Sequence, residues 1–183
     1  EFLYNYNIKM IIVACNTSSA LALETMKDHF NIPIFGVIDP AIKYVENLNK
    51  CKNVVVLGTQ ATIESKAYSK HFKKLISSKN VIEKSCPLFV PIIEEGLISG
   101  KITKDIIRHY LSEYQTNKIN HFILGCTHYP ILKSSIQQVL GKKVQLITSG
   151  EALIPELFQF MDKNQFFSNV SKSETLFYIS DLP

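Results

Sequence analysis

The sequence predicts an α/β fold in which parallel strands alternate with helices that cover both faces of the sheet. Short runs rich in valine and isoleucine recur along the chain, and longer amphipathic stretches separate them. This alternation is typical of βαβ units. The runs are nearly continuous in apolar residues, which indicates strands that are buried on both sides.

The predicted strands are apolar runs bounded by polar or turn-forming residues. In chain order they are MIIVA (10–14), IPIFGVI (32–38), NVVVLG (53–58), HFILG (121–125), VQLIT (144–148) and TLFYIS (175–180). β-Branched and aromatic residues dominate these runs, and such residues fit the pleated surface of a sheet.

Helices are predicted between the strands because apolar side chains recur three or four positions apart. The candidates are SSALALETMKDHF (18–30), IESKAYSKHFKKLI (63–76), DIIRHYLSEYQ (105–115) and YPILKSSIQQVL (129–140). The second candidate carries a lysine-rich face opposite its apolar stripe. A further helix is expected in the opening segment, before the strand at 10–14.

Composition excludes several classes of protein. The chain has 183 residues, 46% of them hydrophobic and 20% charged, which suits a globular protein of one large or two small domains. The net charge of +4 comes from scattered lysines, so neither nucleic acid nor a membrane surface is an expected partner. No apolar run approaches the ~20 residues that a membrane helix needs, and no signal peptide is recognisable.

The four cysteines form no CxxC pair, which argues against a zinc ribbon or a disulfide scaffold. We therefore expect free thiols and a reducing, cytoplasmic location. Cys51 lies in the polar stretch NLNKCKN and is expected at the surface, whereas Cys86 precedes Pro87 and is expected to pack in the interior.

Polar side chains follow three of the predicted strands directly. These strand ends are Cys15-Asn16-Thr17, Thr59-Gln60-Ala61-Thr62 and Cys126-Thr127-His128. Ligands of parallel sheets bind beyond the carboxyl ends of the strands, and the free N–H groups of a following helix favour an anion. The sequence therefore predicts a site for a small anionic ligand.

The similarity of IIVACNT to FILGCTH suggests two related halves, each presenting one cysteine at the same point of the fold. One cysteine alone would suggest a nucleophile with His128 as its base. Two facing thiols suggest instead a base and an acid that invert a stereocentre by proton transfer. A metal site at Cys126 and His128 is not expected, since further ligands at suitable spacing are missing.

Two stretches, VACNTSSALAL (13–23) and LGCTHYPIL (124–132), resemble the two cysteine motifs of the cofactor-independent aspartate/glutamate racemase family, and in particular glutamate racemase. The resemblance extends through IPIFGVIDPA (32–41), VVVLGTQATIESKAY (54–68), CPLFVPIIEEG (86–96) and ITSGEAL (147–153). It covers essentially the whole chain with the expected spacing.

The resemblance implies two α/β domains with the active site in the cleft between them. We expect residues 1–38 plus 148–183 in the first domain and 39–147 in the second. The family's early Asp-Ser strand end and its Tyr-Gly segment have no counterpart here, so the first domain is expected to be incomplete. YISDLP (178–183) resembles the family's Ser-Gly-Asp-Pro turn without its glycine.

The resemblance also implies interconversion of L- and D-glutamate without pyridoxal phosphate or metal, for cell-wall precursors, by a homodimer. Cys15 and Cys126 would be the catalytic acid and base. The binding residues would be Asn16, Thr17, Thr59, Thr62, Thr127 and His128, with Glu94 and His128 assisting the second cysteine. Two alternatives stay open: an aspartate or other amino-acid racemase, and an inactive carboxylate-binding protein.

Overall fold

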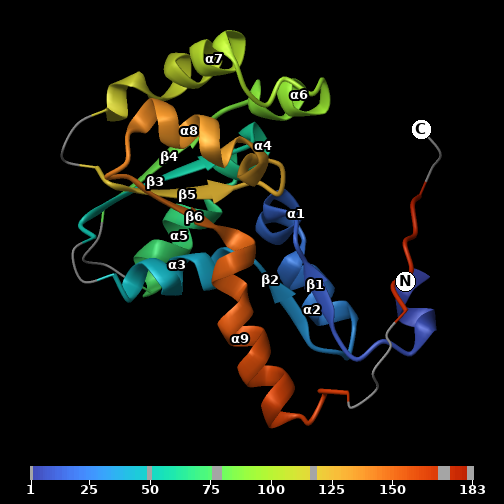
Figure 1. Ribbon diagram of the computed structural model, residues 1–183. Coiled ribbons are helices and arrows are strands. Elements are labelled where there is room, and N and C mark those ends of the chain that lie inside the picture. Colours follow the sequence, from blue (N-terminus) through green and yellow to red (C-terminus); the bar gives the residue numbers. More distant parts are fainter. Residues whose placement is uncertain (1, 49–50, 76–79, 116–118, 169–173, 181–183) are drawn as a thin grey trace.

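The computed structural model describes residues 2–48, 51–75, 80–115, 119–168 and 174–180. Within these ranges the strands form two parallel sheets (Figure 1). The smaller sheet pairs β1 (Ile11–Val13) with β2 (Ile34–Gly36). The larger sheet has the order β4-β3-β5-β6. Its strands are β3 (Asn53–Gly58), β4 (Asn80–Ser85), β5 (His121–Gly125) and β6 (Gln145–Thr148).

Helices alternate with the strands throughout the chain. The α-helices are α1 (Asn16–Leu21), α2 (Leu23–His29), α3 (Ile38–Glu46), α4 (Gln60–Glu64), α5 (Ala67–Leu75), α6 (Phe89–Glu94), α7 (Lys101–Leu111), α8 (Lys133–Leu140) and α9 (Ser149–Lys163). Three short 3-10 helices complete the described elements: η1 (Phe2–Tyr6), η2 (Ser112–Tyr114) and η3 (Tyr129–Leu132).

The larger sheet is buried on both faces, as the sequence predicts. Figure 1 shows α6, α7 and α8 over one face and α3 and α5 over the other. Neighbouring residues of a strand point to opposite faces, so Val55 and Leu57 join the core under α7 and α8, whereas Val54 and Val56 join the core under α3 and α5. The prediction of parallel strands covered on both sides is confirmed.

The carboxyl ends of the central strands meet at one edge of the larger sheet. Gly58 of β3 pairs with Gly125 of β5, and Leu124 pairs with Thr148 of β6. Position 125 requires glycine for a steric reason, because a Cβ there would lie 2.8 Å from the carbonyl oxygen of Leu57. The residues that follow these ends are therefore brought together.

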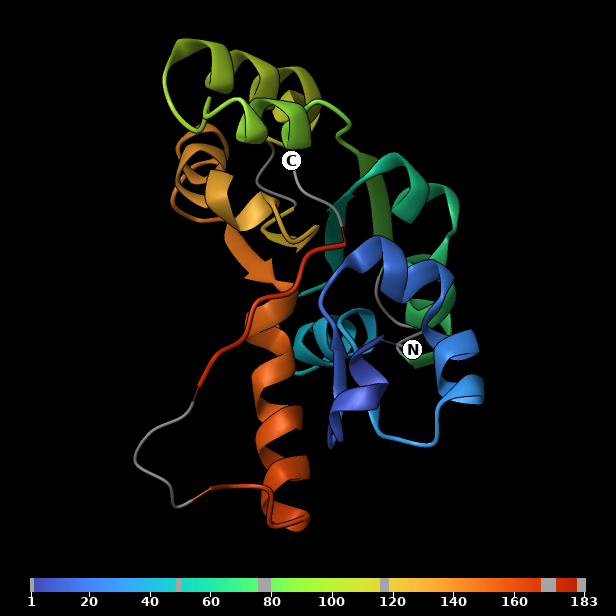
Figure 2. The ribbon, with the colours of Figure 1, turned by 90° about the vertical axis from the view of Figure 1, so that its right-hand side faces the viewer.

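Helix α9 connects the two sheets (Figure 2). Its first turns pack against the larger sheet, where Ala152 and Leu153 are buried. Toward its other end the ring of Phe160 lies 4.9 Å from that of Phe35 on β2. One helix thus contacts both sheets directly.

Five of the six predicted strands are confirmed. One predicted strand does not form, and one strand of the structure was not predicted. Residues 175–180 form no strand, so that prediction was wrong, and residues 181–183 of the proposed turn lie outside the described residues. Strand β4 was missed because Glu83 and Lys84 interrupt its apolar pattern. The Glu83 carboxylate is satisfied at this edge strand by the backbone N–H and the hydroxyl of Ser69.

The predicted helices form, but each is divided into two elements. The stretch 105–115 contains the end of α7 and then η2, and the stretch 129–140 contains η3 and then α8. The stretch 18–30 divides at Ala22 into α1 and α2. The stretch 63–76 divides before α5, where Lys66 adopts a left-handed backbone conformation with φ of 57°; residue 76 lies outside the described residues. Cys51 corrects another expectation, since it is buried and belongs to the core under α3 and α5.

Candidate active site

Cys15 lies at the end of β1 and begins α1. The backbone N–H of Ser18 donates to its Sγ across 3.5 Å, so that the sulfur caps the helix. Partial burial raises the pKa of the Cys15 thiol, but hydrogen bonds from Ser18 and Thr17 outweigh it and leave that pKa below the ordinary value. Because the side chain is exposed, Cys15 is an accessible thiol with increased thiolate character.

Cys126 follows β5 directly and differs from Cys15 in its surroundings. It is buried, and this burial raises the pKa of its thiol, although the backbone N–H of His128 opposes the shift. Negative charge on Cys15 raises the pKa of Cys126 further. The two thiols therefore interact electrostatically, and the Cys15 thiol ionises more readily than the Cys126 thiol.

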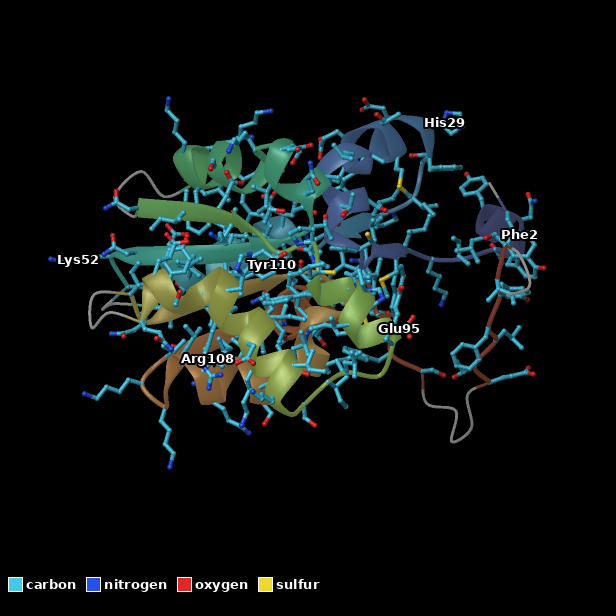
Figure 3. The ribbon with its side chains drawn as sticks, turned by 90° about the horizontal axis from the view of Figure 1, so that it is seen from above. Phe2, His29, Lys52, Glu95, Arg108 and Tyr110 are labelled. Atoms are coloured by element: carbon cyan, nitrogen blue, oxygen red, sulfur yellow. The ribbon has the colours of Figure 1, made fainter. Side chains whose placement is uncertain are left out.

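His128 stands between Cys126 and a carboxylate. Its Nδ1 lies 3.9 Å from Sγ of Cys126, and its Nε2 lies 3.5 Å from Oε1 of Glu94. Glu94 is the last residue of α6, and Figure 3 shows the next residue, Glu95, on the side of the larger sheet that faces the N-terminal elements. The structure thus brings Glu94 to the second cysteine through the imidazole ring.

Three threonine hydroxyls form a closed cluster between the two sheets. The Oγ1 atoms of Thr17, Thr59 and Thr62 lie 3.0 Å from one another in all three pairs. Thr59 also caps α4, because its hydroxyl accepts the backbone N–H of Thr62 across 3.3 Å. Thr17 comes from α1, so this cluster joins the turn of the first cysteine to the end of β3.

Asn16 belongs to a buried network that sequence reasoning did not find. Its Oδ1 accepts hydrogen bonds from the hydroxyls of Tyr68, at 2.7 Å, and Ser149, at 3.2 Å. Tyr68 was missed because a tyrosine within the apolar stripe of a helix resembles a core residue. Ser149 carried a better signal, since it follows β6 as Cys126 follows β5.

A cavity of about 220 Å³ lies where these elements meet. Its wall includes Asn16, Cys126 and Thr127, together with Ser149 and Gly150 at the start of α9. The structure therefore brings most of the site residues expected from the sequence to the cavity, to the threonine cluster, or to the contacts that join Glu94, His128 and Cys126. Cys15 is not part of the cavity wall; it lies between Asn16, which lines the cavity, and the end of β1.

The described part of the chain contains no group of three or more His, Cys, Asp or Glu side chains arranged to hold a metal ion. None of its helices is both long and apolar enough to cross a lipid bilayer.

Comparison with known proteins finds relatives that are all described as racemases. The family model described as Asp/Glu/Hydantoin racemase matches residues 4–157. The glutamate racemase of Aquifex pyrophilus is 45% identical over 160 residues, which are 87% of this chain and 61% of that protein. That of Aquifex aeolicus is 45% identical over 165 residues, 90% of this chain and 63% of that protein. The chain thus spans about three fifths of the length of these relatives.

Solved structures give the same picture. Glutamate racemase from Francisella tularensis in complex with D-glutamate has a TM-score of 0.90 and 37% identity, covering 100% of this chain and 68% of that one. The Thermus thermophilus enzyme in complex with beta-chloro-D-alanine has a TM-score of 0.79 and 36% identity, covering 92% and 62%. The aspartate racemase of Picrophilus torridus, at 22% identity with a TM-score of 0.65, covers 88% and 65% and shares the fold.

Proposed function

The chain belongs to the Asp/Glu/Hydantoin racemase family, and from this premise we propose that it interconverts L- and D-glutamate by proton transfer between Cys15 and Cys126. The observation that carries the proposal is the unlike pair of thiols. The pKa of Cys15 lies below the ordinary value and that of Cys126 above it, so the Cys15 thiol gives up its proton more readily than the Cys126 thiol. A base and an acid are what inversion at a carbon requires.

The proposed reaction needs no group other than the two cysteines for its protons. The thiolate removes the α-proton, and the electron pair of the broken C–H bond stays on the α-carbon and spreads into the carboxylate. The opposite thiol then delivers its proton to the other face of that carbon. In the resting enzyme Cys15 would be the thiolate, so the enantiomer whose α-hydrogen faces Cys15 would react first. The reverse direction exchanges the two roles.

Stabilisation of the carbanion is the harder part of this chemistry, and fixed donors would supply it. We assign the substrate carboxylates to the hydroxyls of Thr17, Thr59 and Thr62 and to the amide of Asn16. These groups are donors without negative charge, which suits an anionic substrate. Thr127 would contribute beside Cys126, where it lines the cavity.

His128 and Glu94 are assigned to the second cysteine. The imidazole of His128 can hydrogen-bond to the sulfur of Cys126, and the carboxylate of Glu94 can hold that ring in place. Support comes from the contacts of this ring, 3.9 Å from Sγ of Cys126 and 3.5 Å from Oε1 of Glu94. Proton transfer to or from Cys126 would therefore be assisted from the side opposite to Cys15.

The proposal extends to organisation and context. The division into residues 1–38 plus 148–183 and residues 39–147 is supported by the two sheets, since β2 ends at Gly36 and β6 ends at Thr148. The proposal includes a homodimer, because the family resemblance suggests one. A cytoplasmic location is supported by the free thiols. The product D-glutamate would supply peptidoglycan precursors.

Proton NMR of L-glutamate in deuterated buffer tests the activity. We expect the α-proton signal to fall with the unchanged chain and to persist with a Cys15→Ala, Cys126→Ala double variant. A parallel sample of L-aspartate, one methylene shorter, tests the substrate, and slower exchange is expected there. A folded chain that exchanges no more glutamate than the double variant would overturn the proposal.

A further inference from the structure

The Asn16 side chain carries an unused hydrogen-bond donor, and Asn16 lines a cavity together with Cys126. Asn16 is only 2% exposed, and its Oδ1 accepts from two hydroxyls. Its Nδ2 finds no hydrogen-bond partner among the described residues. A buried amide N–H without a partner is costly and rare in native proteins. Because Asn16 lines the cavity, a ligand that accepts a hydrogen bond would satisfy this atom.

The direction of the amide depends on the groups that hold Oδ1. Rotation by half a turn exchanges oxygen and nitrogen, so an asparagine presents a fixed donor only when its oxygen is anchored. The Tyr68 hydroxyl, at 2.7 Å, is the shorter of the two anchors. The Ser149 hydroxyl lies 3.2 Å from Oδ1 but also 3.3 Å from the carbonyl oxygen of Leu124, so it serves either acceptor. The Tyr68 hydroxyl also lies 3.5 Å from that of Ser149, but its bond to Oδ1 is much shorter, so Tyr68 is the main donor to Asn16.

Several features keep Tyr68 in this role. Its side chain is fully buried on the inner face of α5, and this burial raises its pKa far above the ordinary value, so the hydroxyl retains its proton. Gly125, one residue before Cys126, lies next to the ring, since a Cβ there would be 3.4 Å from the Tyr68 hydroxyl oxygen, which is an ordinary van der Waals contact. Tyr68 thus fills the space between Asn16, next to Cys15, and Gly125, next to Cys126.

We propose that Tyr68 and Ser149 are positioning residues, which hold the Asn16 amide so that its Nδ2 donates to a carboxylate oxygen of the substrate. This inference rests on the proposed function, in which the substrate is an amino acid with an acceptor at that place. Both residues act on the substrate through Asn16; Ser149 is also part of the cavity wall, whereas Tyr68 is not among the lining residues.

The kinetic test uses Tyr68→Phe in the whole chain, with α-proton exchange of L-glutamate as the assay. We expect KM to rise about tenfold and kcat to change less than about threefold, as for the loss of one hydrogen bond that orients a binding group. Ser149→Ala is expected to raise KM only about threefold, because Tyr68 still donates. In an Asn16→Ala background, Tyr68→Phe should have no further effect on KM.

Thr103→Val is the matched control for a lost buried hydroxyl. Thr103 is fully buried on α7, and its hydroxyl lies 2.9 Å and 2.8 Å from the carbonyl oxygens of Leu97 and Ser99. We expect it to lower stability as Tyr68→Phe does but to leave KM unchanged. If both variants change KM equally, or if Tyr68→Phe still raises KM without Asn16, Tyr68 has only a structural role and the inference is wrong.

A second readout does not depend on activity. The Asn16 side-chain NH₂ resonances of ¹⁵N-labelled chain, identified by their loss in Asn16→Ala, should shift and exchange faster with water in Tyr68→Phe but not in Thr103→Val. An unchanged Asn16 signal in Tyr68→Phe would overturn the inference. Should the unchanged chain exchange no glutamate, the proposed function fails, and this amide signal alone decides whether Tyr68 holds Asn16.

Discussion

The imidazole of His128 contacts Glu94 with one nitrogen and approaches Cys126 with the other. Oε1 of Glu94 lies 3.5 Å from Nε2, and Sγ of Cys126 lies 3.9 Å from Nδ1. The carboxylate and the thiol thus contact the same ring at different nitrogens, so both contacts can exist at once. A charge placed on Glu94 is therefore transmitted to the second cysteine without direct contact.

Glu94→Gln tests this connection. We expect kcat/KM to fall about tenfold from either enantiomer, because the carboxylate no longer holds the His128 ring beside Cys126. The fall must be equal in the two directions, since L- and D-glutamate have equal free energies. Stability should hardly change, because the side chains of His128 and Glu94 are 38% and 64% exposed. Circular dichroism of both reactions measures the rates, and Glu95→Gln is the adjacent control, expected to be unaffected.

The two active-site thiols should differ in reactivity. Alkylation requires the thiolate, so Cys15, exposed and with a lowered pKa, should react before Cys126, which is buried and has a raised pKa. Cys86 should be slowest, since burial raises its pKa to about 12. Peptide mass spectrometry after brief iodoacetamide treatment near neutral pH gives the order. Modification of Cys126 ahead of Cys15 would contradict the assigned resting state.

Removal of either active-site thiol should abolish racemisation. Cys15→Ala and Cys126→Ala are each expected to lower the rate by at least ~100-fold, since each deletes a proton donor or acceptor. Cys51→Ala is the matched control, because Cys51 is a buried cysteine of the core under α3 and α5. It should lose about 1 kcal/mol of stability and keep its rate. Equal losses of rate in all three variants would point to a general effect of cysteine removal.

Gly125→Ala should destabilise the fold. The added Cβ would lie 2.8 Å from the carbonyl oxygen of Leu57, a backbone atom of the neighbouring strand that cannot turn aside. Such a clash typically costs about 1–3 kcal/mol, which lowers Tm by several degrees in a chain of this size. Thermal unfolding measures it. Gly150→Ala, which meets no atom within 4 Å, should leave Tm unchanged or slightly higher.

Local composition was sufficient to predict most of the fold. The central strands β3 and β5 are continuous apolar runs, and only a doubly covered sheet explains them. Strand β4 lies at the edge of the larger sheet, where Glu83 and Lys84 are tolerated, so its pattern did not reveal it. The end of α4 depended on the left-handed backbone of Lys66, a conformation for which lysine gives no signal.

The site, like the fold, contains residues that the sequence could identify and residues that it could not. Cys15 and Cys126 were identifiable because each follows an apolar run and precedes hydrogen-bonding residues. Tyr68 was not, because its hydroxyl is 52 residues away from Asn16 in the chain, and a contact of that range depends on the packing of α5 against α1. The exposure of Cys15 and the burial of Cys126 were equally inaccessible, since both depend on tertiary structure.

The closed cluster of Thr17, Thr59 and Thr62 has a consequence for the arrival of a carboxylate. The three hydroxyls carry one proton each, and the three oxygen–oxygen contacts among them can hold three hydrogen bonds. Each hydroxyl can therefore donate once and accept once within the cluster. A carboxylate accepts but does not donate, so it can be bound only if at least one O–H turns out of the ring. That turn is a rotation about a single C–O bond. The three hydroxyls can therefore satisfy one another, and a hydroxyl can donate to an anion after this rotation without the movement of a heavy atom.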